Sequence, residues 1–460
     1  MSSIYTLLIR SLFFILVWFG LLASCAQKNN EPVVVNEQPV LVSTLPANNA
    51  RVNPDTETVQ FFFDRTVVIV DKNKITLNNS PAPDVSASSN TITVGVGRLN
   101  ENASYTVNLA VSSIKAFPGA MNQQAFTLSF TTEEREEIPI INTLVVQNPT
   151  PEALKVYKFL RDNYGSKIIS GATANVSWNT NEADWVFRHT NIYPAMNCFD
   201  YIHLYASPAN WIDYEQTEVV EDWWNNNGLV SILWHWNVPT AQGSTSYAFY
   251  TNGTNFDASR AVQTGTYEHG IVVADINKVA DYLLLLKQKN IPVIWRPLHE
   301  AAGRWFWWGA KGPAACKALW QLMFNIFEEK GLNNLIWVWT SESNDEDWFP
   351  GHNYVDIIGR DLYNRPAAAA MYNEYTTSRN VYPNYIISLS ECGNVAGITE
   401  QWNAGCRWSW FAPWYDYNRT NNPNSAAFNS TEHIYANINY WQNAFANPNV
   451  ITRDQMPSLK

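Results

Sequence analysis

Residues 276–295 read INKVADYLLLLKQKNIPVIW, and this stretch decides the fold class. Its apolar residues from Ile276 to Leu284 keep i, i+3, i+4, i+7 and i+8 spacing, which predicts a helix with one buried face. The run 291–295 follows at once and is nearly continuous in apolar residues, which predicts a buried strand. A helix that leads directly into a buried strand is typical of α/β proteins with a parallel sheet.

The same alternation extends along the chain from about residue 150. Helical patterns separate eight short apolar runs that we interpret as strands, at 168–171, 192–196, 229–234, 291–295, 334–339, 354–358, 385–389 and 407–411. Eight βα units in about 310 residues predict a (β/α)8 TIM barrel over 150–460. The alternative, a doubly wound open sheet, is less favoured because no Gly-rich nucleotide-binding turn is present.

A different pattern precedes the barrel. Residues 38–132 contain short stretches of strict apolar–polar alternation separated by turn residues, which predicts an antiparallel sandwich. This region resembles bacterial immunoglobulin-like domains through LPANNA at 45–50, Phe63-Asp64 and FTLSFTT at 126–132. Its expected role is that of a spacer, with sugar binding as the alternative. Residues 133–149, which begin with an acidic stretch, are expected to be a solvated linker.

The N-terminus is predicted to be a targeting segment. Arg10 precedes an apolar run at 11–22 of signal-peptide length, and Leu22-Ala-Ser-Cys25 resembles a bacterial lipobox. We therefore expect a signal peptide at 1–24, lipid on Cys25, and a polar tether at 25–37. An uncleaved anchor is the alternative. The protein would then be held in the bacterial cell envelope through its N-terminal lipid, on the periplasmic or the outer face of what we expect to be the outer membrane.

Four cysteines remain after Cys25. Cys198, Cys316, Cys392 and Cys406 are widely and irregularly spaced, which gives no zinc-binding or CxxC pattern. An envelope compartment would permit a Cys392–Cys406 disulfide.

Composition narrows the class of ligand. Only 15% of the 460 residues are charged and the net charge is −11, so we expect no nucleic acid partner, because such binding relies on Lys and Arg. The chain is rich in aromatic residues, with 21 Trp, 22 Tyr and 21 Phe. This combination suits a neutral ligand with flat apolar faces, such as a sugar.

Chemistry is expected at the ends of the predicted strands, where TIM barrels place their active sites. Glu300 follows the fourth strand and Glu391 follows the seventh. Two carboxylates that face each other across a neutral cleft are what glycoside hydrolysis requires. His299-Glu300 also resembles the start of a zinc-protease motif, but Gly303 stands where that motif needs His. No metal or other cofactor is expected.

These residues carry a resemblance to a known family. The segment WRPLHEAAGRWFWWG at 295–309 is similar to the acid/base segment of glycoside hydrolase family 26, and SECG at 390–393 to its nucleophile segment. The segments VDIIGRDLY at 355–363, WHWNVP at 234–239 and WSWF at 408–411 match further parts of the family pattern. The resemblance implies a retaining mechanism with Glu300 as general acid and base and Glu391 as nucleophile.

The resemblance also assigns supporting roles. Tyr363 and Arg296 would stabilise ionised Glu391, with Asp356 as a further supporting residue of the same segment as Tyr363. The residues expected to bind the sugar are His235, His299, Trp305, Tyr363 and Trp410.

The implied activity is endo-hydrolysis of β-1,4-mannosidic bonds in mannan, galactomannan or glucomannan by a monomer that binds the polysaccharide or its oligosaccharides. Alternatives are β-1,3-xylanase or mixed-linkage β-glucanase activity and, in a different class, a non-catalytic surface glycan-binding lipoprotein.

Overall fold

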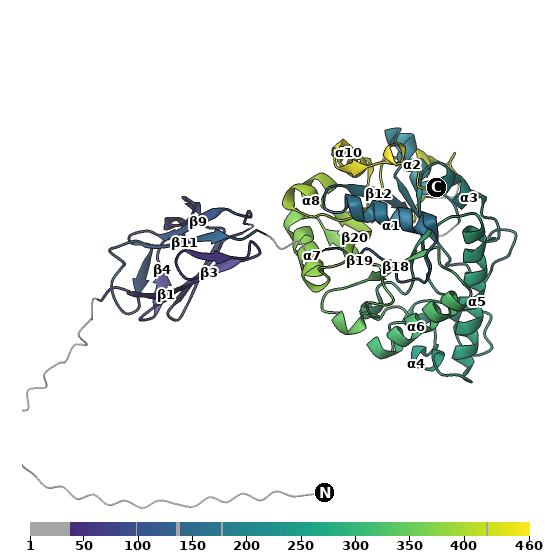
Figure 1. Cartoon of the computed structure of the whole chain (residues 1–460), viewed down its shortest axis with the longest axis horizontal. Coiled ribbons are helices and arrows are strands. Elements are labelled where there is room, and N and C mark those ends of the chain that lie inside the picture. The colour runs from purple at the N-terminus through teal and green to yellow at the C-terminus, as the bar shows by residue number, and fades with distance from the viewer. Residues whose placement is uncertain (1–36, 98, 135–138, 176–177, 420–421) are drawn as a thin grey trace, which may run out of the picture. The chain divides into compact units, whose positions relative to one another are not determined.

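The structure is a computed structural model that describes residues 37–97, 99–134, 139–175, 178–419 and 422–460. The chain divides into two compact units, one ending at Glu137 and the other beginning at Ile138 (Figure 1). The predicted signal peptide, Cys25 and all of the tether except Glu37 lie outside the described residues. Within the described ranges, no helix has the length and apolar character that crossing a membrane requires.

The first unit is a β-sandwich, as predicted. Its strands are β1 (Leu41–Leu45), β2 (Ala50–Val52), β3 (Thr58–Phe63), β4 (Val67–Ile69), β5 (Ile75–Leu77), β6 (Ser80–Pro81), β7 (Asp84–Ser88), β8 (Thr91–Gly95), β9 (Ser104–Leu109), β10 (Ile114–Ala116) and β11 (Phe126–Thr132). A sheet of order β1-β3-β8-β7 and a sheet of order β2-β11-β9-β5-β6 form the two layers. Alternate residues such as Val59, Phe61 and Phe63 face a separate core, which explains the alternation in the sequence.

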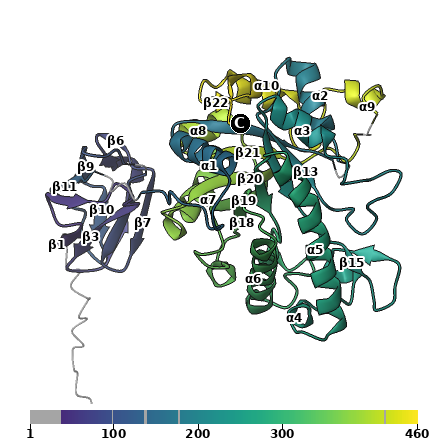
Figure 2. The same ribbon diagram turned by 45° about the vertical axis from the view of Figure 1, so that its right-hand side comes forward.

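The second unit is a closed barrel of eight parallel strands, which confirms the predicted fold class. In spatial order the strands are β13 (Met196–Asp200), β14 (Leu229–Leu233), β17 (Val293–Arg296), β18 (Leu335–Thr340), β19 (Ile357–Arg365), β20 (Ile386–Val395), β21 (Trp410–Pro413) and β12 (Ile168–Thr173). Pairing of β12 with β13 closes the ring. Helices surround the strands in both views (Figures 1 and 2).

The barrel helices and additional strands have the following bounds. The helices are α1 (Pro151–Asn163), α2 (Asn181–Thr190), α3 (Glu218–Asn225), α4 (Ala258–Ala261), α5 (Tyr267–Gln288), α6 (Pro313–Glu329), α7 (Ala368–Val381), α8 (Ile398–Ala404), α9 (Ala426–Asn429) and α10 (Ile438–Ala446). A hairpin of β15 (Val238–Pro239) and β16 (Tyr247–Ala248) lies between β14 and α4, and β22 (Val450–Ile451) pairs with β12.

Indole rings fill much of the layer between strands and helices. Trp337 of β18 packs against Trp320 and Phe324 of α6, with ring centroids 5.5 and 5.1 Å apart. Among the tryptophans that the structure describes, twelve are almost completely buried. Most of the tryptophan content is therefore core, and the exposed remainder is the part that can meet a ligand.

Part of the predicted linker belongs to the barrel. Leu144 and Val146 are buried in the barrel core. The carboxylate of Asp356 accepts hydrogen bonds from Val145 N at 2.8 Å and from Trp337 N at 2.7 Å. The linker prediction is therefore wrong for residues 139–149. The prediction followed the acidic stretch at the start of this range and overlooked the apolar residues after it.

The same contacts correct the role of Asp356. It immediately precedes β19, at the end of the barrel where the strands begin, and Asp361 lies five residues further along that strand. At about 3.3 Å per residue the two are about 16 Å apart, so Asp356 supports the barrel base and not the active site.

The largest departures from the predicted bounds are in three strands. The second strand begins at Met196, where the predicted run ended, and it carries the polar residues Asn197 and Asp200. β19 and β20 extend to Arg365 and Val395, well beyond the predicted apolar runs. Asp361 and Glu391 therefore lie within strands and not after them.

Candidate active site

Glu300 lies in the tight loop that follows β17. Leu298, Glu300 and Arg304 have φ of 48°, 51° and 60°, in the left-handed region that residues other than glycine rarely adopt. The Trp305 indole Nε1 donates a 2.9 Å hydrogen bond to Glu300 Oε2. The loop thus holds the carboxyl group of Glu300 in one orientation at a cost in backbone strain.

Two glycines allow this loop to close. A Cβ at Gly303 would lie 2.0 Å from the Trp305 ring, and a Cβ at Gly309 would lie 2.0 Å from the Ala301 carbonyl oxygen. Gly303 therefore makes room for the indole that binds Glu300, at the position where a zinc protease would carry its second histidine.

Glu391 lies on β20 beside Asp361 on β19. Arg360 pairs with Leu389 and Asp361 with Glu391, so the register skips Ser390 in a bulge. Because residues that pair directly point to the same face of a sheet, the bulge brings both carboxylates to the same side.

Two donors stabilise the negative charge of Glu391. Arg296 Nη2 donates to Oε2 at 2.6 Å, and the Tyr363 hydroxyl donates to Oε1 at 2.6 Å. Burial and the charge of Glu391 hold the pKa of Tyr363 well above its usual value, so its hydroxyl keeps the proton that it donates. A Cβ at Gly393 would lie 2.7 Å from the Tyr363 ring, so the lack of a side chain at this position leaves room for the ring.

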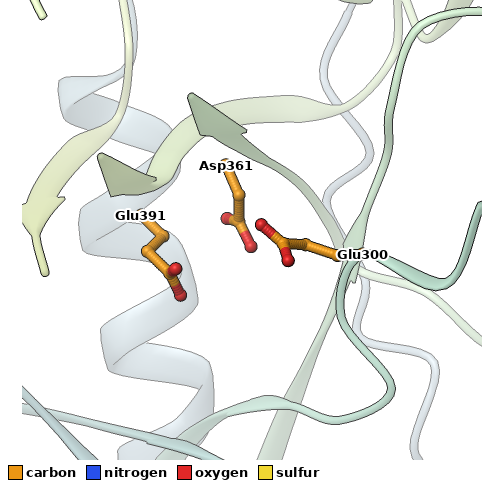
Figure 3. A group of neighbouring side chains, drawn as sticks. All are labelled: Glu300, Asp361 and Glu391. Carbon is orange, nitrogen blue, oxygen red and sulfur yellow. The ribbon is translucent and has the colours of Figure 1, made fainter. Parts of the chain in front are cut away.

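Three carboxylates converge at the centre of the barrel mouth (Figure 3). One oxygen from each of Glu300, Asp361 and Glu391 lies within 4.8 Å of the others. Burial, and then the charges of Glu391 and Asp361, raise the pKa of Glu300 to about 9. Glu300 is therefore protonated near neutral pH, while Glu391 faces a guanidinium group.

Asp361 has a structural partner on each oxygen. Arg296 Nη1 donates to Oδ2 at 2.6 Å and the Ser390 hydroxyl donates to Oδ1 at 2.7 Å. By distance the three carboxylates could hold a metal ion. Arg296 already binds two of them, however, and supplies the positive charge that a cation would bring.

The two predicted histidines lie side by side. Their ring centroids are 4.5 Å apart, and Asp200 Oδ2 lies 2.6 Å from His235 Nδ1. Burial, with His235 and Arg296 nearby, holds the pKa of His299 well below its usual value, so this ring is neutral. A neutral imidazole can both donate and accept, which suits a sugar hydroxyl. Sugar binding by either ring stays a prediction.

The two predicted aromatic platforms differ in exposure. Trp305 is 44% exposed and, with Tyr250, lines a surface pocket of about 490 Å³. Trp410 on β21 is 2% exposed and offers a ligand little of its surface. Trp305 thus remains well placed for stacking, and the role of Trp410 stays a prediction.

Sequence reasoning misses three contributors to the site, namely Asp361, Asp200 and Gly393. The signal available for the two aspartates is that each is the single acidic residue of its strand, Asp200 at the end of β13 and Asp361 within β19. Gly393 stands within a matched motif, but the sequence does not show which ring it accommodates. Cys392 carries a buried free thiol, so the permitted Cys392–Cys406 disulfide is not formed.

Family models match both units. The model of the bacterial Ig-like domain matches residues 35–132, and the model of glycosyl hydrolase family 26 matches residues 145–443, about two thirds of the chain. The chain belongs to glycosyl hydrolase family 26.

Individual relatives agree with this family. The chain is 31% identical over 362 residues to mannan endo-1,4-β-mannosidase B of Piromyces sp., covering 74% of this chain and 60% of that protein. It thus spans about three fifths of this curated relative. The family 26 domain of an endo-β-mannanase/endo-β-glucanase from Prevotella bryantii is 38% identical with a TM-score of 0.63, over 69% of this chain and 99% of that one. A β-mannanase from a symbiotic protist of the termite Reticulitermes speratus, complexed with gluco-manno-oligosaccharide, is 32% identical with a TM-score of 0.59, over 70% and 99%.

Proposed function

We propose that this chain is a retaining endo-β-1,4-mannanase acting on mannan, galactomannan or glucomannan. The observation that carries the proposal is the pair Glu300 and Glu391, whose oxygens approach within 4.8 Å and whose surroundings are opposite in electrostatic character. Retaining glycosidases hold their carboxyl groups about 5–5.5 Å apart, whereas inverting enzymes need about 6.5–9.5 Å to admit a water. The relatives with mannanase activity supply the substrate class.

In the first step, Glu300 protonates the glycosidic oxygen as Glu391 attacks the anomeric carbon. The C–O bond to the leaving sugar breaks, and a glycosyl ester to Glu391 forms. Tyr363 and Arg296, which bind the two oxygens of Glu391, orient it for attack. In this proposal Trp305, which donates a hydrogen bond to Glu300, lies beside the leaving sugar.

In the second step, the ionised Glu300 takes a proton from water, and the resulting hydroxide attacks the anomeric carbon. The ester bond breaks and Glu391 regains its negative charge. Two inversions give net retention of configuration. The raised pKa of Glu300 makes it a proton donor at neutral pH and, once ionised, a strong base.

The proposal is tested by reducing-sugar release from a panel of polysaccharides. Galactomannan and glucomannan should be hydrolysed much faster than β-1,3-xylan and lichenan, and the Glu391→Gln variant should be inactive on all of them. Faster release of reducing sugar from β-1,3-xylan or lichenan would mean that the protein acts on that polysaccharide and not on mannan. Binding of mannan without cleavage by the wild type would favour a non-catalytic glycan-binding protein.

We further propose that the protein is a monomeric lipoprotein of the bacterial cell envelope. The lipobox-like segment ending at Cys25 supports anchoring. The Cys25→Ala variant should lose incorporation of radiolabelled palmitate and leave the membrane fraction. Unchanged lipid labelling in that variant would contradict the proposal. A single species with the mass of one chain in sedimentation, for the protein released from lipid, is the result expected for a monomer.

A further inference from the structure

A group of aromatic side chains lies on the loops after β13 and β14. We call Tyr205, Trp211 and Tyr247, together with the neighbouring His203, the rim aromatic cluster. Trp211 is 62% exposed, Tyr205 42% and Tyr247 40%. The rings of Tyr205 and Tyr247 stack at 4.6 Å with planes 20° apart, and His203 meets Trp211 edge-on at 4.9 Å. None of these residues belongs to the catalytic group described above.

The loop after β13, which carries His203, Tyr205 and Trp211, is anchored to the barrel by hydrogen bonds. Tyr214 N donates to Ser207 Oγ at 3.1 Å, and the Tyr214 hydroxyl donates to Asp200 O at 3.0 Å. Lys278 Nζ, on α5, donates to Leu204 O at 2.8 Å. Exposed rings on a loop with this many anchors are pre-organised, so a ligand that binds them loses little affinity to ordering of the loop.

The two loops that carry the rim aromatic cluster also contact His235 beside the catalytic centre. Asp200, which ends β13 just before this loop, holds His235. The hairpin of β15 and β16 carries Tyr247, and Phe249 follows directly after β16 with its ring 5.2 Å from that of His235. Asn237 of the same connection donates to Ile202 O at 2.8 Å and ties the two loops together.

The chemistry of the cluster fits a neutral, partly apolar ligand. Its exposed members are Tyr and Trp, and burial lowers the pKa of His203, so this ring adds no positive charge. Large exposed rings gathered together are uncommon on protein surfaces and mark binding sites. A β-linked mannose unit offers a flat C–H face to an aromatic ring and hydroxyls to the tyrosines.

We propose that the rim aromatic cluster binds mannosyl units of the polysaccharide that lie away from the scissile bond, with Trp211 as the main stacking surface. This inference rests on the proposed mannanase function and adds to it a preference for long chains. A long substrate that occupies the cluster forms a more stable complex with the enzyme. A short substrate cannot reach the cluster, so the stability of its complex does not depend on it.

The test compares kcat/KM for mannotetraose and mannohexaose in the wild type and in Trp211→Ala. The variant should lose about tenfold on mannohexaose, the size of effect that loss of one aromatic stacking contact gives, and less than twofold on mannotetraose. Trp211→Phe keeps a ring and should recover most of the loss. Phe187→Ala removes a 37% exposed ring from the outer helix α2 and serves as the matched control. Its kcat/KM values for mannotetraose and mannohexaose should both be unchanged.

The outcomes separate the two proposals. If the wild type cleaves neither oligosaccharide nor mannan, the proposed function fails. If the wild type is active but Trp211→Ala leaves the ratio of the two kcat/KM values within twofold, the rim aromatic cluster is not a sugar-binding site. An equal loss on both substrates also overturns the inference, because it means that Trp211 acts on folding or on the catalytic centre.

Discussion

Glu300 and Glu391 differ in the partners that surround them, and this difference supports the roles proposed for them. Glu300 receives one neutral indole N–H, whereas Glu391 receives a guanidinium and a phenol. With an activated aryl β-mannoside, whose leaving group hardly needs protonation, Glu300→Ala should stall in the second step. Azide needs no base and should restore turnover with a β-azide product, measured by NMR of the product.

The complementary variant gives the opposite stereochemistry. Glu391→Ala lacks the attacking group, so azide can only replace it from the opposite face and give an α-azide. On polymer both variants should lose at least the roughly 10²–10⁴-fold that general acid–base help contributes. A β-azide from Glu391→Ala and an α-azide from Glu300→Ala would show that the two roles are reversed.

Asp361 sets the pH range over which Glu300 keeps its proton. Burial, Glu391 and Asp361 all raise the pKa of Glu300, so removal of the Asp361 charge must lower it. In Asp361→Asn the alkaline limb of the pH profile of kcat/KM should move to lower pH, by about one unit, because kcat/KM reports the free enzyme. Ser390→Ala removes a hydrogen bond to Asp361 but no charge, and its alkaline limb should stay in place. A limb that stays fixed in Asp361→Asn would rule out this electrostatic coupling.

Motif reasoning locates the two glutamates because their neighbours form long, specific segments. It does not assign Asp361 or Asp200, because each acts through contacts between strands that are distant in sequence. Asp361 reaches Arg296 across 65 residues, and Asp200 reaches His235 across 35. Such pairings depend on strand register, which no local pattern contains.

At the scale of elements, the number and order of barrel strands could be predicted, but several strand ends could not. Apolar runs mark the parts of strands that cross the packed core. The C-terminal ends of β19 and β20 continue past the core and still pair with each other, as Arg365 does with Val395. Those polar ends carry the catalytic groups. β13 shares only Met196 with its predicted run and carries the polar residues Asn197 and Asp200, so no continuous apolar run marks it in the sequence.

The start of β19 tests the corrected role of Asp356. Asp356→Ala leaves Val145 N and Trp337 N without their acceptor, at a cost of about 1–3 kcal/mol for each buried group. The free energy of unfolding should fall by about 2–6 kcal/mol in urea titrations, while kcat at 25 °C should hardly change. Asp356→Asn, which keeps one carbonyl acceptor, should lose less. A large fall in kcat with unchanged stability would return Asp356 to the catalytic machinery.

At the scale of the whole molecule, the division at Ile138 predicts where the chain can be cut. A protein beginning at Ile138 retains the complete barrel core and should match the full chain in an assay of mannan hydrolysis. A protein beginning at Pro151 lacks Leu144, Val146 and the Val145 contact to Asp356, and burial of those two side chains is worth about 3–6 kcal/mol.

The two truncations are compared by thermal unfolding and by mannan hydrolysis. The shorter protein should unfold at a markedly lower temperature than the longer one. Equal melting temperatures would mean that residues 139–150 add nothing to the barrel, and inactivity of the longer protein would mean that the sandwich is needed for activity.

The uneven burial of the indoles gives this protein an optical property. Among the described tryptophans, only Trp211 and Trp305 expose more than a third of their surface. A water-soluble quencher such as iodide can therefore reach chiefly these two, against a blue-shifted background from the buried majority. Sugar that covers either ring should reduce quenching without changing the fluorescence of the rest, so the native protein reports occupancy of its own binding surface without any label.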